Sequence, residues 1–143
     1  MPAEFERQGL RFAYPENWQL EEAKTDEGWS VTAQSPGTAF FFLNVQSERP
    51  DVQQVIDTIL AALREDYSEL ESEPATESIA GRSARGHDIQ FFSMDLVNTC
   101  WTRCFRTAEH TVLVLCQVSD VELETAEPVL RAMCASLVVG PSA

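Results

Sequence analysis

Residues 100–119, CWTRCFRTAEHTVLVLCQVS, carry the strongest information about the fold of this chain. Aromatic, threonine and β-branched residues fill two runs, and the short polar segment 108–110 separates them. These residue types and the short link predict two strands joined as a hairpin. The second run, 111–119, has apolar side chains on both faces, which is typical of a strand covered on both sides. The stretch therefore predicts the centre of a sheet that is buried between two layers.

The segments around this hairpin also read as strands. Residues 39–47 are again apolar on both faces, so this strand is expected to be central and covered on both sides. Residues 70–79 are acidic with Pro74 in the middle, which allows an edge strand at best. The remaining expected strands are 10–14, 18–23, 29–35, 82–93 and 95–107.

Two segments have the three- and four-residue apolar spacing of an amphipathic helix. The first is 51–68, with Asp51 as its N-cap. The second is roughly 121–137, and it contains Pro128. Because proline is tolerated in the first turn of a helix, we expect the regular part to begin near Thr125.

This order of elements predicts the α+β class and a single domain over residues 1–143. Tight turns join most neighbouring strands, so the sheet is expected to be mainly antiparallel, with about six to eight strands. The two amphipathic helices would cover its two faces and give an α/β/α sandwich.

The composition excludes several classes of partner. The net charge is −13, from 23 acidic and 10 basic residues, which argues against nucleic acid and against an anionic membrane surface. No apolar run approaches the length of a membrane span, so no membrane insertion is expected. The start of the sequence lacks the apolar core of a signal peptide, which predicts a cytoplasmic protein.

The cysteines could indicate a metal or redox site, depending on the secondary structure around them. On a helix, Cys100 and Cys104 could share a ligand, and the apolar residues here also fit a helical stripe. On a strand, which the residue types favour, their Cα atoms would lie ~13 Å apart. At that separation the two thiols could not bind the same metal ion. If the loop 108–110 sets the register, Thr107 faces Thr111, and the cysteines would gather on one face of the sheet. The set expected there is Cys100, Cys104 and Cys116, with Cys134 packing from the second helix.

We interpret this cysteine set as a thiol-rich core, with no metal or cofactor, because buried cysteine behaves as a small hydrophobic residue. The alternative is a soft-metal or thiol-sensing site at Cys100, Cys104 and Cys116, which lacks the usual C-x-x-C spacing.

Four arginines stand out in the otherwise acidic chain. Residues 79–107 contain Arg82, Arg85, Arg103 and Arg106 against two aspartates. This hairpin could present guanidinium groups to a small anionic ligand. The alternative is that these arginines pair with the protein's own acidic residues.

The stretch LRFAYPENWQLEE, residues 10–22, resembles the start of PsbP-like domains, including their DcrB-like bacterial branch. The segments IAGRSARG (79–86) and ASLVV (135–139) resemble the later hairpin and the end of the last helix in those domains. The resemblance implies an antiparallel sheet between helices and a largely non-enzymatic role in accessory, adaptor or chaperone proteins. It transfers no catalytic or metal-binding residue to this chain.

The sequence contains no phosphate-binding loop, nucleophile elbow or zinc-protease motif, so we expect no enzyme activity. The favoured function is an adaptor or chaperone-like module that binds a protein partner through a sheet face or groove. A homodimer is one form that such a module could take. The alternative is a domain that binds a small anion on the Arg82, Arg85, Arg103 and Arg106 surface.

Overall fold

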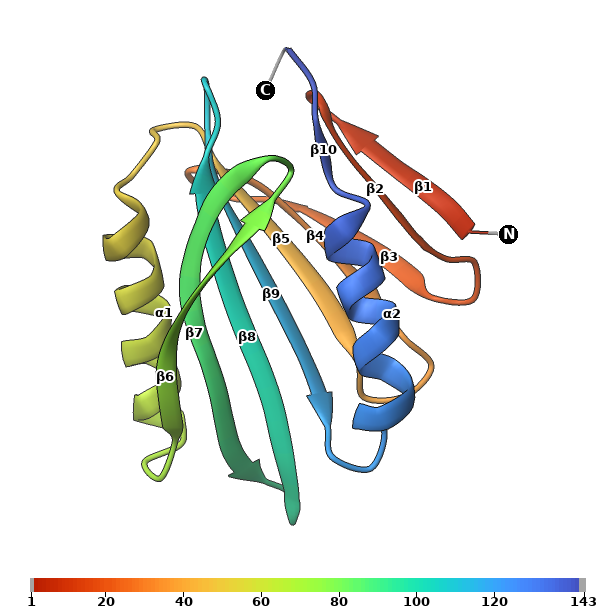
Figure 1. Cartoon of the computed structure of the whole chain (residues 1–143), viewed down its shortest axis with the longest axis vertical. Coiled ribbons are helices and arrows are strands. Elements are labelled where there is room, and N and C mark those ends of the chain that lie inside the picture. The colour runs from red at the N-terminus through yellow and green to blue at the C-terminus, as the bar shows by residue number, and fades with distance from the viewer. Residues whose placement is uncertain (1, 142–143) are drawn as a thin grey trace.

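The computed structural model describes residues 2–141, which form two β-sheets and two helices (Figure 1). All strand pairs in both sheets are antiparallel, so the predicted α+β class is confirmed. In spatial order, the strands of the larger sheet are β3 (Gln19–Lys24), β4 (Gly28–Gln34), β5 (Phe40–Gln46), β9 (Thr111–Ser119), β8 (Leu96–Arg106), β7 (Arg82–Ser93) and β6 (Glu71–Ile79).

Helix α1 (Val52–Asp66) covers one face of the larger sheet, over β7 and β8. The Asp51 carboxylate accepts a hydrogen bond of 3.1 Å from the backbone N–H of Gln54, which confirms the predicted N-cap. Val55, Ile56 and Leu60 form the buried stripe of the helix. The predicted amphipathic helix is therefore confirmed, apart from its last residues.

The opposite face is covered by a helix and a second sheet together. Helix α2 (Leu123–Ala135) packs against β9 and β5, as Figure 1 shows on the side away from α1. Beside it lies a small sheet of β1 (Pro2–Arg7), β2 (Leu10–Pro15) and β10 (Val138–Val139).

Aromatic rings join the small sheet to the core. The Phe12 ring lies 5.3 Å from the Phe5 ring and 4.9 Å from the Phe41 ring, centre to centre, so β2 packs directly over β5. The predicted antiparallel sheet between two helices is thus confirmed, and an additional small sheet shares the second layer with α2.

Helix α2 begins before the predicted N-cap at Thr125. Glu122 is the N-cap, and its carbonyl accepts from the N–H of Ala126 at 2.9 Å. Pro128 therefore lies inside the helix. Its missing N–H would have bonded to the carbonyl of Glu124, an exposed residue in the first turn where water can reach the backbone.

The hairpin β8–β9 has a register that differs by one residue from the prediction. Arg106, not Thr107, lies opposite Thr111. Thr107 belongs to the turn, where its N–H bonds to the carbonyl of His110 at 2.9 Å and its hydroxyl accepts from the His110 N–H at 2.9 Å. A one-residue shift moves every side chain of one strand to the other face relative to its partner.

The coverage of the central strands is also less complete than predicted. Phe41, Leu43 and Val45 of β5 are buried under α2 and the small sheet, whereas Phe40 and Phe42 on the other face are only half-buried. Helix α1 lies over β7 and β8 and leaves the β5 end of that face uncovered.

Candidate functional site

The four predicted site arginines do not share one surface. Opposite residues of an antiparallel pair point to the same face, so Arg85 lies on the α1 face with its partner Cys104. Arg106 lies two residues farther along the same face of β8. Arg82 and Arg103 point to the α2 face, Arg82 opposite Ile79 and Arg103 opposite Gly86.

Arg103 is the central group of a buried ion-pair network. Its side chain is 5% exposed, and it donates to Asp88 at 2.8 Å and to Glu77 at 2.5 Å. It also donates to the carbonyl of Thr102 at 2.8 Å. Hydrogen bonds and the negative charge of the two carboxylates raise the Arg103 pKa against the opposing effect of burial. For this residue the structure confirms pairing with the protein's own acidic residues.

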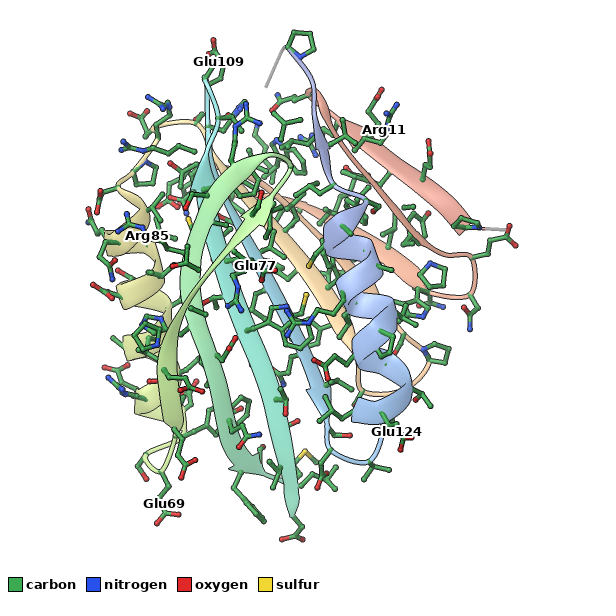
Figure 2. The ribbon with its side chains drawn as sticks, in the orientation of Figure 1. Arg11, Glu69, Glu77, Arg85, Glu109 and Glu124 are labelled. Atoms are coloured by element: carbon green, nitrogen blue, oxygen red, sulfur yellow. The ribbon has the colours of Figure 1, made fainter. Side chains whose placement is uncertain are left out.

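The other three arginines make contacts near the edges of the hairpin. Arg85 donates to the side chain of Gln53 in α1 at 3.4 Å, and Figure 2 shows it beside that helix, away from Glu77. Arg106 donates to the carbonyls of Arg49 and Pro50, before α1. Arg82 donates to the carbonyl of Ala80.

The cysteines divide into two pairs on opposite faces of the sheet. Cys100 and Cys104 pack under α1, with Ile89 and Leu113 respectively. Burial raises the pKa of both thiols to about 12, so both are protonated at neutral pH. Cys116 points to the other face, beside Cys134 of α2. The predicted set of three on one face is wrong, because of the register shift in β8–β9.

Within residues 2–141, no group of three or more histidine, cysteine, aspartate or glutamate side chains could hold a metal ion. All four cysteines are buried in the apolar core, two on each face of the sheet.

A polar cavity of about 470 Å³ opens on the α2 side of the sheet, beside α2. Glu71, Glu73 and Asp88 line it, and Trp101 lies at its base. The guanidinium of Arg131 stacks on the Trp101 indole, 4.2 Å from the ring centre. Three carboxylates thus line the cavity, and Arg131 is the one arginine among its lining residues.

A larger groove of about 650 Å³ lies between the end of β2 and α2. Its walls are mainly apolar. Val129, Ala132 and Met133 form one wall, and Pro2, Ala13, Tyr14 and Pro15 form the other, followed by Glu16 and Asn17 at the β2–β3 turn. The Ser136 hydroxyl fixes this arrangement, because it accepts from the backbone N–H of Ala13 at 2.9 Å.

Local sequence patterns do not predict this groove. They indicate a strand over 10–14 and a helix over roughly 121–137, and neither pattern shows that the two segments meet. The available signal was the YPENW segment itself, residues 14–18. Its Trp18 is buried in the core and anchors the turn, which leaves Tyr14 and Pro15 at the groove.

Solved structures share this architecture. The cyanobacterial PsbP (CyanoP) of Synechocystis sp. PCC 6803 aligns with a TM-score of 0.71 and 10% identity, over 96% of this chain and 92% of that chain. The chain has the PsbP fold. LpqN, involved in cell envelope biogenesis of Mycobacterium tuberculosis, aligns at TM-score 0.63 and 11% identity, over 98% of this chain and 86% of that chain.

A third structure with the PsbP fold is PA94 of Pseudomonas aeruginosa, a protein of unknown function. It aligns at TM-score 0.59 and 14% identity, over 98% of both chains. At these identities the likeness shows the fold alone. The sequence matches no protein-family model and no curated protein. Neither helix within residues 2–141 is long and apolar enough to cross a bilayer.

Proposed function

We propose that this protein is a non-enzymatic adaptor or chaperone-like module that binds an apolar segment of a protein partner. The observation that carries the proposal is the groove between β2 and α2, with its mainly apolar walls. Apolar surface that is concave and reachable from solvent favours an apolar ligand, because binding removes both surfaces from water.

The charge of the protein defines the partner further. With a net charge of −13, the protein repels acidic segments and attracts basic ones over a distance of roughly a Debye length. We therefore expect the bound segment to contain apolar side chains flanked by lysine or arginine. The PsbP fold is consistent with this role.

Ala132 provides a sharp test, because it is exposed, lies in α2 and lines the groove. Ala135 is an exposed alanine of the same helix that does not line the groove, so it offers a matched control. The probe is a fluorescent peptide with a leucine-rich centre and lysine flanks, compared with a peptide of the same centre and glutamate flanks.

We expect the basic peptide to bind more tightly than the acidic one, with NMR shift changes centred on Tyr14, Val129 and Ala132. Ala132→Glu should weaken binding at least tenfold, and Ala135→Glu should change it less than twofold. Equal binding of both variants, or shift changes that map elsewhere, would refute the groove as the binding site.

The anionic-ligand alternative at Arg82, Arg85, Arg103 and Arg106 stays a prediction. The structure gives it no added support, since these arginines point to two faces and Arg103 is occupied by Glu77 and Asp88. Arg85 and Arg106 still share the α1 face. Titration of the wild type and of the double variant Arg85→Gln, Arg106→Gln with citrate or phosphate would test whether these two arginines bind an anion.

A further inference from the structure

Two thiols from different elements meet inside the α2 layer. The sulfur atoms of Cys116 in β9 and Cys134 in α2 lie 3.8 Å apart, and both cysteines are unoxidised. A disulfide requires a sulfur separation of about 2 Å. Side-chain rotation and a small shift of α2 would close the difference, since the two residues already face each other across the helix–sheet contact.

Cys134 is the more accessible of the pair. It is 8% exposed, whereas Cys116 and the two cysteines under α1 are fully buried. Cys134 therefore lies nearer to solvent, and Cys116 is fully enclosed. A thiol nearer to solvent that lies beside a second, resolving thiol is an arrangement found at redox-sensitive cysteine pairs.

The surroundings also favour Cys134 as the reacting thiol. The pKa of Cys134 lies below its usual value because of its hydrogen bond with the Cys116 thiol. Burial raises the pKa of Cys116 well above its usual value. Burial and the negative charge of Glu77 oppose this lowering of the Cys134 pKa, whereas the positive charge of Arg131, one turn before Cys134, supports it.

We propose that Cys116 and Cys134 form a dithiol site that hydrogen peroxide oxidises to a disulfide, which ties α2 to β9. First, the Cys134 thiolate attacks one peroxide oxygen, the O–O bond breaks, and the leaving hydroxide takes up a proton to become water. Cys134 is then a sulfenic acid. Next, the Cys116 sulfur attacks the Cys134 sulfur and the S–O bond breaks. The hydroxide leaves with the Cys116 proton as a second water.

The disulfide would act on the fold in two ways. It joins residues 18 positions apart, so it restricts the unfolded chain and should raise the unfolding midpoint by several degrees. It would also restrain α2 next to Met133, a residue of the groove wall. The site itself stands on the sulfur geometry and does not depend on the function proposed for the groove.

Trypsin separates all four cysteines, which allows a direct test. The expected peptides are 86–103 with Cys100, 104–106 with Cys104, 107–131 with Cys116 and 132–143 with Cys134. The native full-length chain is treated with increasing hydrogen peroxide, its remaining thiols are alkylated, and the digest is analysed by mass spectrometry.

We expect the first product to be peptide 107–131 linked to peptide 132–143, with the loss of two hydrogen atoms and reversal by dithiothreitol. The same link should form in the Cys100→Ala, Cys104→Ala double variant and be absent from Cys134→Ala. Thermal unfolding of each reduced variant shows whether it is folded.

Three results would overturn the proposal. The first is oxidation of Cys134 to sulfinic acid while Cys116 remains alkylatable. The second is a first disulfide that contains Cys100 or Cys104. The third is protection of all thiols by folding. In that case the native wild-type chain stays reduced at peroxide concentrations that cross-link the chain unfolded in guanidinium.

Discussion

The Arg103 guanidinium lies 2.8 Å from the Asp88 carboxylate and is buried on the sheet face that α2 only partly covers. Asp88 and Glu77 are about half and two-fifths exposed, so the network joins a buried cation to carboxylates that water still reaches. The sequence shows an arginine-rich hairpin, and the fold uses its most central arginine to hold β6, β7 and β8 together.

We predict that Arg103→Met lowers the free energy of unfolding by about 2–3 kcal/mol, because charged hydrogen bonds to Glu77 and Asp88 and a bond to a backbone carbonyl are lost. Chemical denaturation measures the change. The control is Arg85→Met, which removes only an exposed bond and should cost less than about 0.5 kcal/mol. Similar values for the two variants would contradict the network's role.

Glu122 should make stability depend on pH. Its carboxylate accepts from the Thr38 hydroxyl and from the Thr38 N–H at 2.6 Å, and these bonds lower its pKa from the usual 4.5. A lowered pKa in the folded state means that the stabilisation is complete above about pH 4.5 and is lost as the pH falls through the folded-state value.

The measurement is the unfolding midpoint between about pH 3 and pH 6 for the wild type and Glu122→Gln. We expect the variant to be less stable at pH 6 and the difference to shrink toward pH 3. Glu124→Gln, at an exposed position in the same helix, serves as the control. A difference between wild type and Glu122→Gln that stays constant over this range would rule out the assigned role of the carboxylate.

Gly86 should not tolerate a side chain. A Cβ at this position would overlap the backbone carbonyl of Thr102 on the neighbouring strand. Gly86→Ala is expected to destabilise the fold by about 1–3 kcal/mol through this overlap, measured by denaturation. Ser83→Ala, at an exposed position of the same strand, should be close to neutral. An unchanged stability of Gly86→Ala would show that β7 and β8 are less closely paired here.

The Asp51 cap of α1 should contribute about 1 kcal/mol to stability. Asp51→Ala removes the acceptor for the Gln54 N–H, and thermal or chemical unfolding reports the loss. Glu65→Ala removes an exposed acid near the other end of the same helix, where a negative charge is unfavourable. Glu65→Ala should leave the stability unchanged or raise it slightly. A greater loss of stability in Glu65→Ala than in Asp51→Ala would contradict the role of Asp51 as the cap.

Features with a local sequence signal were predictable. The apolar spacing of 51–68 identified α1 together with its Asp51 cap. The runs 39–47 and 111–119, which have apolar residues on both faces, identified central strands. The turn at Ala80–Gly81 also has a local cause, because its positive φ angles of 53° and 75° suit a two-residue hairpin turn and glycine adopts such angles easily. Each of these signals lies within a few residues of the element that it specifies.

Features that depend on distant partners were not predictable. Strand β1 is short and polar, and β10 has two residues, so both exist only because β2 lies between them. The groove likewise needs Tyr14 and Val129, which are far apart in the sequence, to meet across the β2–α2 contact.

The amino-acid sequence by itself thus determined that a mainly antiparallel sheet packs against two amphipathic helices, because periodicity and turn chemistry are local properties. Only the tertiary structure decided which thiols meet. A turn centred on the Thr107 side chain shifts β8 against β9 by one residue, and this shift places Cys116 beside Cys134 instead of Cys100 and Cys104. Since side chains alternate along a strand, one residue of register reverses the face on which a cysteine lies.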